Sequence, residues 1–234
     1  MHELALFPLP LVLMPHAPLT LHVFEPRYRQ MIGHCISNKL PFGVVLVEPA
    51  TQFSGEFTDR LAMGEWLNRF ENEGDEYPDY LPHTVCTSAI IAEHVQLEDG
   101  RFLLQCVGGE RVRLTGLSRR TPYLVAQVEP WPAEVTPAAK AAAVALTEIY
   151  GRYWRAVQRA TGIEQTPVDL ALDAAEMSWQ LAHMLQVDEV RKQEWLMMST
   201  AQRLRSIITA IRAETHTLPK EAPHGSHVGP WSWN

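Results

Sequence analysis

The N-terminal segment carries the pattern that most restricts the fold of this chain. Residues 4–48 read in order as a strand, a proline-rich crossover, a strand, a capped helix and a strand. Leu19, Leu21 and Val23 alternate with polar residues, and this period of two predicts a strand with one buried face. The run FGVVLV at residues 42–47 is continuously apolar, which is typical of a strand buried on both faces. The chain therefore begins as a β-rich domain.

A short helix is predicted between these two strands. Pro26 suits its first turn, because the ring fixes φ and the missing N–H would have no intrahelical acceptor there. Glu25 stands at the cap, where we expect its carboxylate to accept hydrogen bonds from the first amides and to complement the helix dipole. Phe24 closes the preceding strand, and we interpret the run Phe24, Glu25, Pro26, Arg27 and Tyr28 as a signature of the fold rather than as catalytic residues.

Further strands follow a segment of different composition. Residues 50–82 are rich in glycine, carboxylates and aromatic residues with little periodicity, which indicates an insertion. Residues 85–97 and 101–107 predict two strands joined by a two-residue hairpin turn at Asp99-Gly100. Gly108-Gly109 predicts another turn, and two more strands are predicted at residues 110–117 and 123–131.

Beyond residue 132 the period changes to that of helices. Thr136 followed by Pro137 predicts a helix start, and Gly162 predicts its end. Three more helix starts are predicted at Asp173, at Asp188 and at Ser199 or Thr200. We therefore expect a helical bundle over residues 136–214 and a disordered tail over residues 215–234.

The N-terminal run is similar to the N-terminal substrate-recognition domain of the Lon protease family. The resemblance covers roughly residues 1–214 and implies an α+β fold, with a PUA-like β pseudo-barrel over residues 1–132 ahead of the helical bundle. The insertion at residues 50–82 has no counterpart that we can identify in the family. The matching residues are Leu6, Phe7, Pro8, Leu9, Pro15, Leu19, Leu21, Phe24, Glu25, Pro26, Arg27, Tyr28, Arg29, Phe42 and Gly43.

Composition argues against several partners and compartments. The net charge of −7 disfavours nucleic acid, and the nearest approach to a basic cluster, Arg111, Arg113, Arg119 and Arg120, is interpreted as the solvent face of a strand and its turn. No run reaches the ~18 apolar residues of a membrane span. The three cysteines form no C-x-x-C pair, which disfavours a disulfide framework and favours a reducing cytoplasm.

The sequence lacks the ATPase and protease motifs of a full Lon protease. Gly-Lys occurs nowhere, so there is no phosphate-binding loop, and no lysine has a setting like the proteolytic dyad of the Lon family. The resemblance therefore implies a standalone recognition domain without ATPase or protease domains. A Cys/His hydrolase using Cys35, Cys86 or Cys106 is a less favoured alternative, because all three cysteines lie in predicted apolar positions.

Neither a metal nor a cofactor is predicted. His216, His224 and His227 lie in the predicted tail, where four preorganised zinc ligands are not expected. The insertion also holds a cluster of carboxylates without the order of a calcium loop. These are Glu71, Glu73, Asp75, Glu76 and Asp79.

The resemblance implies a non-enzymatic module that binds unfolded or extended polypeptide. We expect a client segment to lie in a groove between barrel and bundle, or along an exposed strand edge. A separate ATPase or protease is a further partner that the resemblance allows. Trp66, Phe70, Tyr77 and Tyr80 are the candidate contact residues, as aromatic residues placed among turn residues. The alternative is an RNA-binding PUA-like protein, although the charge makes nucleic acid the weaker prediction.

Overall fold

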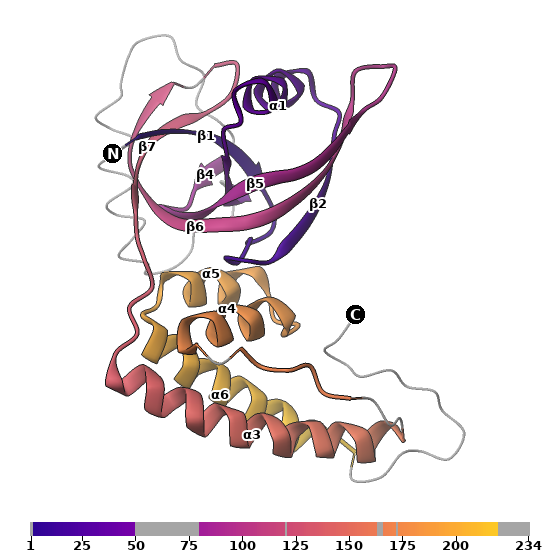
Figure 1. The fold of residues 1–234 in the computed structure, drawn as a ribbon, viewed down its shortest axis with the longest axis vertical. Helices are drawn as coiled ribbons and strands as arrows, with labels where there is room; N and C mark the ends of the chain where they lie inside the picture. Colours follow the sequence, from indigo (N-terminus) through magenta and orange to yellow (C-terminus); the bar gives the residue numbers. More distant parts are fainter. Residues whose placement is uncertain (1, 50–79, 120, 163–165, 172, 220–234) are drawn as a thin grey trace. The chain divides into compact units, whose positions relative to one another are not determined.

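The computed structural model describes residues 2–49, 80–119, 121–162, 166–171 and 173–219 (Figure 1). Contacts within the chain divide it into two units, Met1–Pro132 and Ala133–Asn234. In the described residues, the first unit is a mixed sheet with one helix, and the second contains helices alone. The chain therefore has the predicted α+β fold.

Five strands of the first unit form a closed ring. Their order is β1-β7-β6-β5-β3, and β3 returns to pair in parallel with β1, where Leu6 lies opposite Gly43. β2 pairs with the outer part of β6, and β4 pairs with β3. The strands are β1 (His2–Leu9), β2 (Pro18–Val23), β3 (Phe42–Pro49), β4 (Tyr80–Pro82), β5 (Val85–Gln96), β6 (Phe102–Arg119) and β7 (Val125–Pro130).

The ring encloses an apolar core. β3 was predicted to be buried on both faces, and Val44, Val45 and Leu46 are indeed buried. Side chains from distant parts of the chain meet inside the ring, among them Leu6, Val45, Cys86, Leu114 and Ala126. Removing this apolar area from water is the main favourable term in the stability of the unit.

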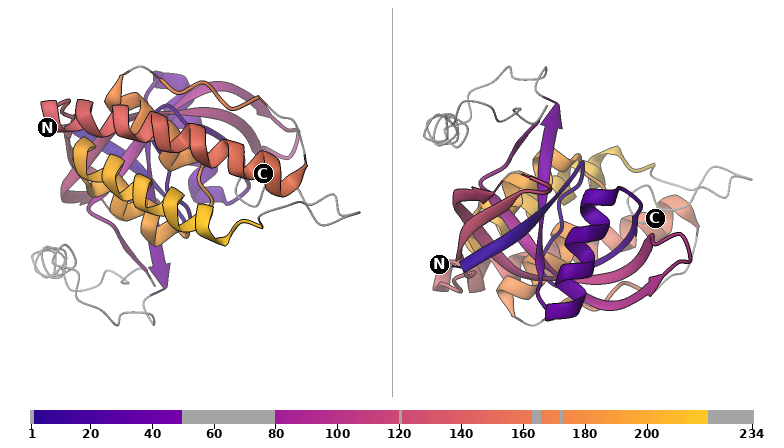
Figure 2. Two further views of the ribbon diagram at one scale, coloured as in Figure 1. Left: turned by 90° about the horizontal axis from the view of Figure 1, so that it is seen from below. Right: turned by 90° about the horizontal axis from the view of Figure 1, so that it is seen from above.

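Helix α1 (Pro26–Asn38) lies against the strands, as the right-hand view of Figure 2 shows. Its predicted apolar stripe is buried, and the ring of Tyr28 lies 4.5 Å from that of Phe7. The predicted role of Glu25 is wrong in one respect. Glu25 is the cap residue, but its side chain makes no hydrogen bond to the helix amides and instead pairs with Arg27 at 2.9 Å. Because the Arg27 guanidinium is only two residues away, the Glu25 carboxylate forms an ion pair with it and does not accept hydrogen bonds from the helix amides.

The β5–β6 hairpin has a longer loop than the predicted two residues. Leu97 donates to the carbonyl of Arg101 at 2.8 Å, so Glu98, Asp99 and Gly100 form a three-residue loop. Gly100 has a φ of 80°, the left-handed conformation that closes three-residue hairpins and that glycine adopts without steric cost.

The turn predicted at Gly108-Gly109 is wrong. β6 continues through both residues, which lie in the middle of this strand, and its register against β5 shifts between Gly108 and Arg111. The glycines are needed for close approach, since a Cβ on Gly108 would collide with the carbonyl oxygen of Met14. The crossover is held there by hydrogen bonds from Gly108 to Ala17 and from His16 to Gly108, both 2.8 Å.

The prediction that Arg111 faces solvent is also wrong. Its side chain is buried, and it donates to the carbonyls of Trp131 at 2.9 Å and Pro132 at 3.2 Å. The guanidinium carbons of Arg111 and Arg113 lie 4.1 and 4.2 Å from the Trp131 ring centre. Arg119 stacks on Tyr123, and Arg120 lies outside the described residues. The three described arginines of this predicted solvent face therefore stack on two different aromatic rings.

The helices of the second unit begin where their caps predict. Thr136 accepts from Ala139 at the start of the first helix, and Ser199 and Gln202 form a reciprocal capping box at the start of the last. The left-hand view of Figure 2 shows the first and last helices side by side. The helices are α3 (Pro137–Thr161), α4 (Ala174–Met184), α5 (Glu189–Met197) and α6 (Thr200–Thr217). Residues 215–217, assigned to the tail from sequence, thus belong to α6, and residues 220–234 lie outside the description.

A buried arginine joins three of these helices. Arg203 of α6 donates to Ser178 Oγ of α4 at 2.9 Å and to the carbonyls of Trp195 and Met198 at the end of α5, at 3.1 and 2.9 Å. Its guanidinium also packs on the Trp179 ring. A buried charge is tolerated where it is hydrogen-bonded in this way.

Candidate functional site

The first unit carries an exposed sheet surface made of three rows of side chains. One row is Ile90, Val107 and Pro18, the next is Glu93, Gln105 and Thr20, and the third is Val95, Leu103 and His22. We call these nine residues the β2–β6–β5 face. Its four large apolar side chains are exposed to 54% at Ile90, 39% at Val107, 58% at Val95 and 42% at Leu103. Large apolar side chains gathered on one surface indicate a binding surface more strongly than scattered ones do.

The sequence of β6 explains why this surface is apolar. Phe102, Leu104 and Cys106 point into the core, as their burial shows. Leu103 and Val107 occupy the alternate positions, so the strand is apolar on both sides. This double pattern is present in the sequence, but the alternate positions were not predicted as a site.

The outer part of β5 also offers a strand edge. β3 pairs with β5 only as far as Ala89, and within the part of the chain that the structure describes, Ile90–Gln96 pairs with β6 alone. The main-chain donors and acceptors on the other side of this segment pair with no other described strand, which is the arrangement of a sheet edge.

The polar groups of the face are nearly neutral in sum. Thr20 Oγ1 lies 2.9 Å from Gln105 Oε1 in the middle row, and Glu93 is the only carboxylate among the nine residues. No lysine or arginine belongs to the face, and the Phe24 ring packs edge-on against His22 beside it. The face is suited to a partner with apolar side chains and main-chain hydrogen-bonding groups.

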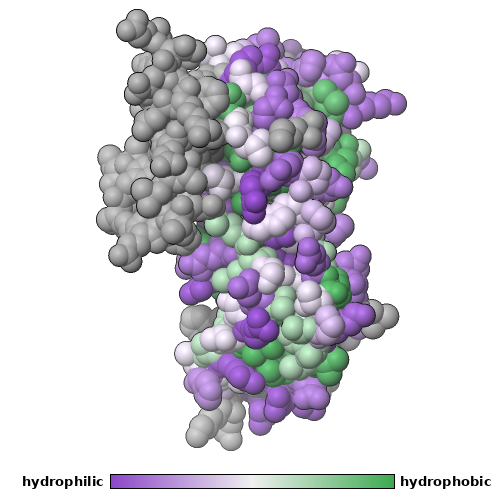
Figure 3. All heavy atoms as spheres, turned by 90° about the vertical axis from the view of Figure 1, so that its left-hand side faces the viewer, coloured by the Kyte–Doolittle hydropathy of each residue, from purple (hydrophilic) through white to green (hydrophobic). Residues whose placement is uncertain are grey.

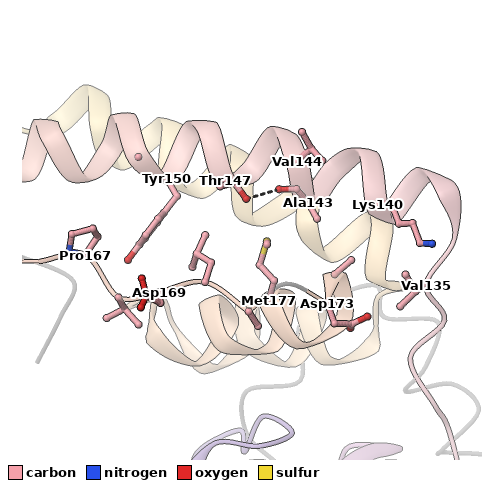
Figure 4. A pocket seen from close by; sticks show the side chains of 15 residues that line it. Val135, Lys140, Ala143, Val144, Thr147, Tyr150, Pro167, Asp169, Asp173 and Met177 are labelled. Atoms are coloured by element: carbon pink, nitrogen blue, oxygen red, sulfur yellow. Dashed lines mark hydrogen bonds between the residues drawn. The ribbon is translucent and has the colours of Figure 1, made fainter.

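The second unit contains a separate groove, shown in Figure 4. It has a volume of about 590 Å³ and lies between α3, residues 167–171 and the start of α4. Its lining is mainly apolar, with Tyr150 and Asp169 at one end and Lys140 at the other. Burial raises the pKa of Tyr150, while a hydrogen bond with the backbone of Val168 lowers it. Figure 3 shows hydrophobic side chains gathered on the surface of this unit.

The three thiols are buried and poorly suited to nucleophilic chemistry. Burial raises the pKa of Cys35 to about 11, of Cys86 to about 12 and of Cys106 to about 11. The thiolate is the reactive form, so all three side chains are protonated and inert near neutral pH.

The structure describes the predicted contact residues only in part. Trp66, Phe70 and Tyr77 lie outside the described residues, and Tyr80 begins β4, opposite Pro49. His216 is in the last turn of α6, whereas the acidic cluster of residues 71–79 lies outside the description. Among the described residues, no group of three or more potential metal ligands comes together, and none of the helices has the length and apolar character needed to cross a bilayer.

Comparison with known families shows to which family the chain is related. The sequence model of the "ATP-dependent protease La (LON) substrate-binding domain" matches residues 3–213. The chain belongs to this family. The extent of the match confirms the resemblance predicted from the N-terminal run, and a substrate-binding role is the one that the family description carries.

Solved structures confirm the fold of the chain. A Lon N-terminal domain protein from Xanthomonas campestris has 23% sequence identity and a TM-score of 0.58, covering 89% of this chain and 98% of that one. The N-terminal domain of the Mycobacterium avium complex Lon protease has 13% identity and a TM-score of 0.57, covering 90% and 98%. No curated protein matches the chain.

Proposed function

We propose that the protein binds extended polypeptide on the β2–β6–β5 face. The observation that carries the proposal is the exposure of Ile90, Val95, Leu103 and Val107 on one sheet surface next to an open strand edge. Apolar side-chain pockets beside unpaired main-chain groups are the two elements of recognition by strand addition. The first supplies selectivity for apolar side chains, and the second supplies affinity for any extended backbone.

The spacing of the rows predicts a preference in the client. Successive rows are two residues apart on β6, which corresponds to about 7 Å along a strand. A client strand added beside β5 would present residues i, i+2 and i+4 to the same side. The apolar outer rows favour apolar client residues at i and i+4, and the row of Glu93, Gln105 and Thr20 favours a polar residue at i+2.

The proposal is tested by changing the apolar rows without touching the core. We expect the double variant Val95→Ser, Leu103→Ser to bind a reduced, carboxymethylated polypeptide about tenfold or more weakly, because the two side chains lose apolar contact area. Fluorescence anisotropy of the labelled polypeptide gives the dissociation constant. Val190→Ser is the matched control, since Val190 is an exposed valine on α5 and far along the chain from the face. Equal affinity of all three proteins would contradict the proposal.

We propose binding without catalysis. The raised pKa values of the three thiols support this, since a Cys/His hydrolase needs an accessible thiolate. RNA binding, which a PUA-like barrel allows, is the weaker proposal because the nine residues of the face include no lysine or arginine. Displacement of the bound polypeptide from this face by single-stranded RNA would make RNA binding the stronger proposal.

The compartment and further partners are proposed on the same basis. The three free, buried cysteines support the reducing cytoplasm predicted from sequence. A separate ATPase or protease remains the proposed receiver of a bound client, and co-purification with such an enzyme is the observation that would identify it.

A further inference from the structure

The groove of the second unit is a feature that polypeptide binding on the β2–β6–β5 face leaves unexplained. Its apolar lining includes Val144, which is 66% exposed, and Val168, which is 41% exposed. A volume of about 590 Å³ is within the range of pockets that hold organic ligands or large side chains. The groove is open to solvent over apolar atoms, so covering it would be favourable.

The chain itself supplies an apolar sequence after the last helix of this unit. Residues 219–234 follow α6 and are rich in proline, glycine and polar residues, except at their end, where the sequence reads VGPWSWN. Two of the seven tryptophans of the protein, Trp231 and Trp233, lie there within three residues. We propose that Val228–Asn234 docks into the groove of its own molecule, with both indoles against the apolar lining.

The distances along the chain allow this docking. Tyr153 of α3 donates to Glu214 of α6 at 2.8 Å, so the last turn of α6 lies beside α3. Tyr150, one turn before Tyr153, already lines the groove. Leu218 and Trp231 are separated by enough residues to span about 40 Å when extended. The groove lining from Tyr150 to Lys140 needs only about 15 Å of helix.

The chemistry of the segment matches that of the groove. In an extended chain Trp231 and Trp233 point to the same side, about 7 Å apart, so both rings can enter one groove. A buried indole N–H seeks an acceptor. The carboxylate of Asp169 at the Tyr150 end of the groove is such an acceptor, as Figure 4 shows.

Disulfide trapping in the full chain tests the docking. Thr147 is exposed and lines the groove, so we pair Thr147→Cys with Ser232→Cys, which lies between the two tryptophans. The matched control is Ala145→Cys with Ser232→Cys, because Ala145 is exposed on the same helix but does not line the groove. The three native cysteines are buried and do not compete. Mild oxidation followed by mass spectrometry measures the rate of intramolecular disulfide formation.

We expect the Thr147 pair to close about tenfold faster than the Ala145 pair, because docking raises the local concentration of the thiol at the groove. Adding Trp231→Ala and Trp233→Ala should slow the Thr147 pair to the rate of the control. Equal rates for the two pairs, or closure that is insensitive to the tryptophans, would overturn the proposal. A disulfide between two molecules would also overturn it and assign the groove to a second copy. Both cysteine positions on α3 are exposed, so the fold of the helix is retained in either variant.

Discussion

The guanidinium carbon of Arg203 lies 3.2 Å from the centre of the Trp179 ring, which places a buried cation on an aromatic face in the core of the second unit. The same side chain bonds Ser178 and two main-chain carbonyls. One residue of α6 thus fixes the positions of α4 and α5. The unit depends on a polar contact where an apolar one would be usual.

Replacing Arg203 by alanine should destabilise the protein by about 3 kcal/mol, because the carbonyls of Trp195 and Met198 lose a donor and the ring loses its cation. Urea unfolding followed by tryptophan fluorescence measures the change. Arg205→Ala is the control, since Arg205 is exposed two residues later on the same helix. A loss of stability no greater than that of the control would show that the buried contacts of Arg203 do not stabilise the unit.

Two glycine substitutions should have opposite effects. Gly108→Ala brings a methyl group onto the Met14 carbonyl, and we expect a loss of about 1–3 kcal/mol in unfolding free energy. Gly33→Ala meets no atom within 4 Å on α1, and we expect a gain of about 0.5–1 kcal/mol from the higher helix propensity of alanine. Thermal unfolding of both variants gives the comparison. A tolerated alanine at position 108 would contradict the close approach of the crossover to β6.

The raised pKa values of the thiols predict slow alkylation of the folded protein. At pH 8 iodoacetamide should leave Cys35, Cys86 and Cys106 unmodified over a time in which an exposed cysteine reacts fully, because burial holds their pKa values at about 11, 12 and 11. Mass spectrometry counts the alkyl groups added, and denatured protein is the positive control.

The raised pKa values of the thiols also predict how the stability of the fold depends on pH. The unfolded thiols lose protons near pH 9 while the folded ones keep theirs, so stability should fall as the pH rises from about 9 towards 11.

Arg111 and Arg113 both contact the Trp131 ring, but they should not contribute equally to stability. Arg111→Met should cost about 2 kcal/mol in unfolding free energy, since the carbonyls of Trp131 and Pro132 lose their buried donor. Arg113→Met should cost well under 1 kcal/mol, because Arg113 is largely exposed and its Glu129 partner lies 3.9 Å away. Calorimetric unfolding of the two variants measures both values. Equal losses would mean that the stacking on Trp131, which both arginines share, determines the stability.

Local signals in the sequence predicted more of the fold than long-range ones did. The caps at Thr136, Asp173 and Ser199 predicted helix starts correctly, because a cap and the amides that donate to it lie within four residues. Gly108 was misread as a turn, since glycine indicates that a side chain is not tolerated but does not indicate which atom approaches. The Met14 carbonyl that approaches lies more than ninety residues earlier in the chain.

The candidate site was predictable only in its composition. Leu103 and Val107 alternate with core residues, and this pattern indicates a strand that is apolar on both sides. The pattern does not reveal which side stays uncovered, because that depends on residues far apart in the sequence that pack against the other side of β6. The burial of Arg111 was missed for a similar reason, since Trp131 follows it by twenty residues and no period connects the two.

The pairing that closes the ring also sets the order of events during synthesis. β1 is made before the strands with which it pairs, since His2 pairs with Val128 and Leu6 with Gly43. A nascent chain therefore cannot seal the barrel until β7 has left the ribosome, and before then one side of β1 is left with no neighbouring strand. Translation speed through residues 50–130 should consequently decide how long the emerging domain is exposed to misassociation with other new chains.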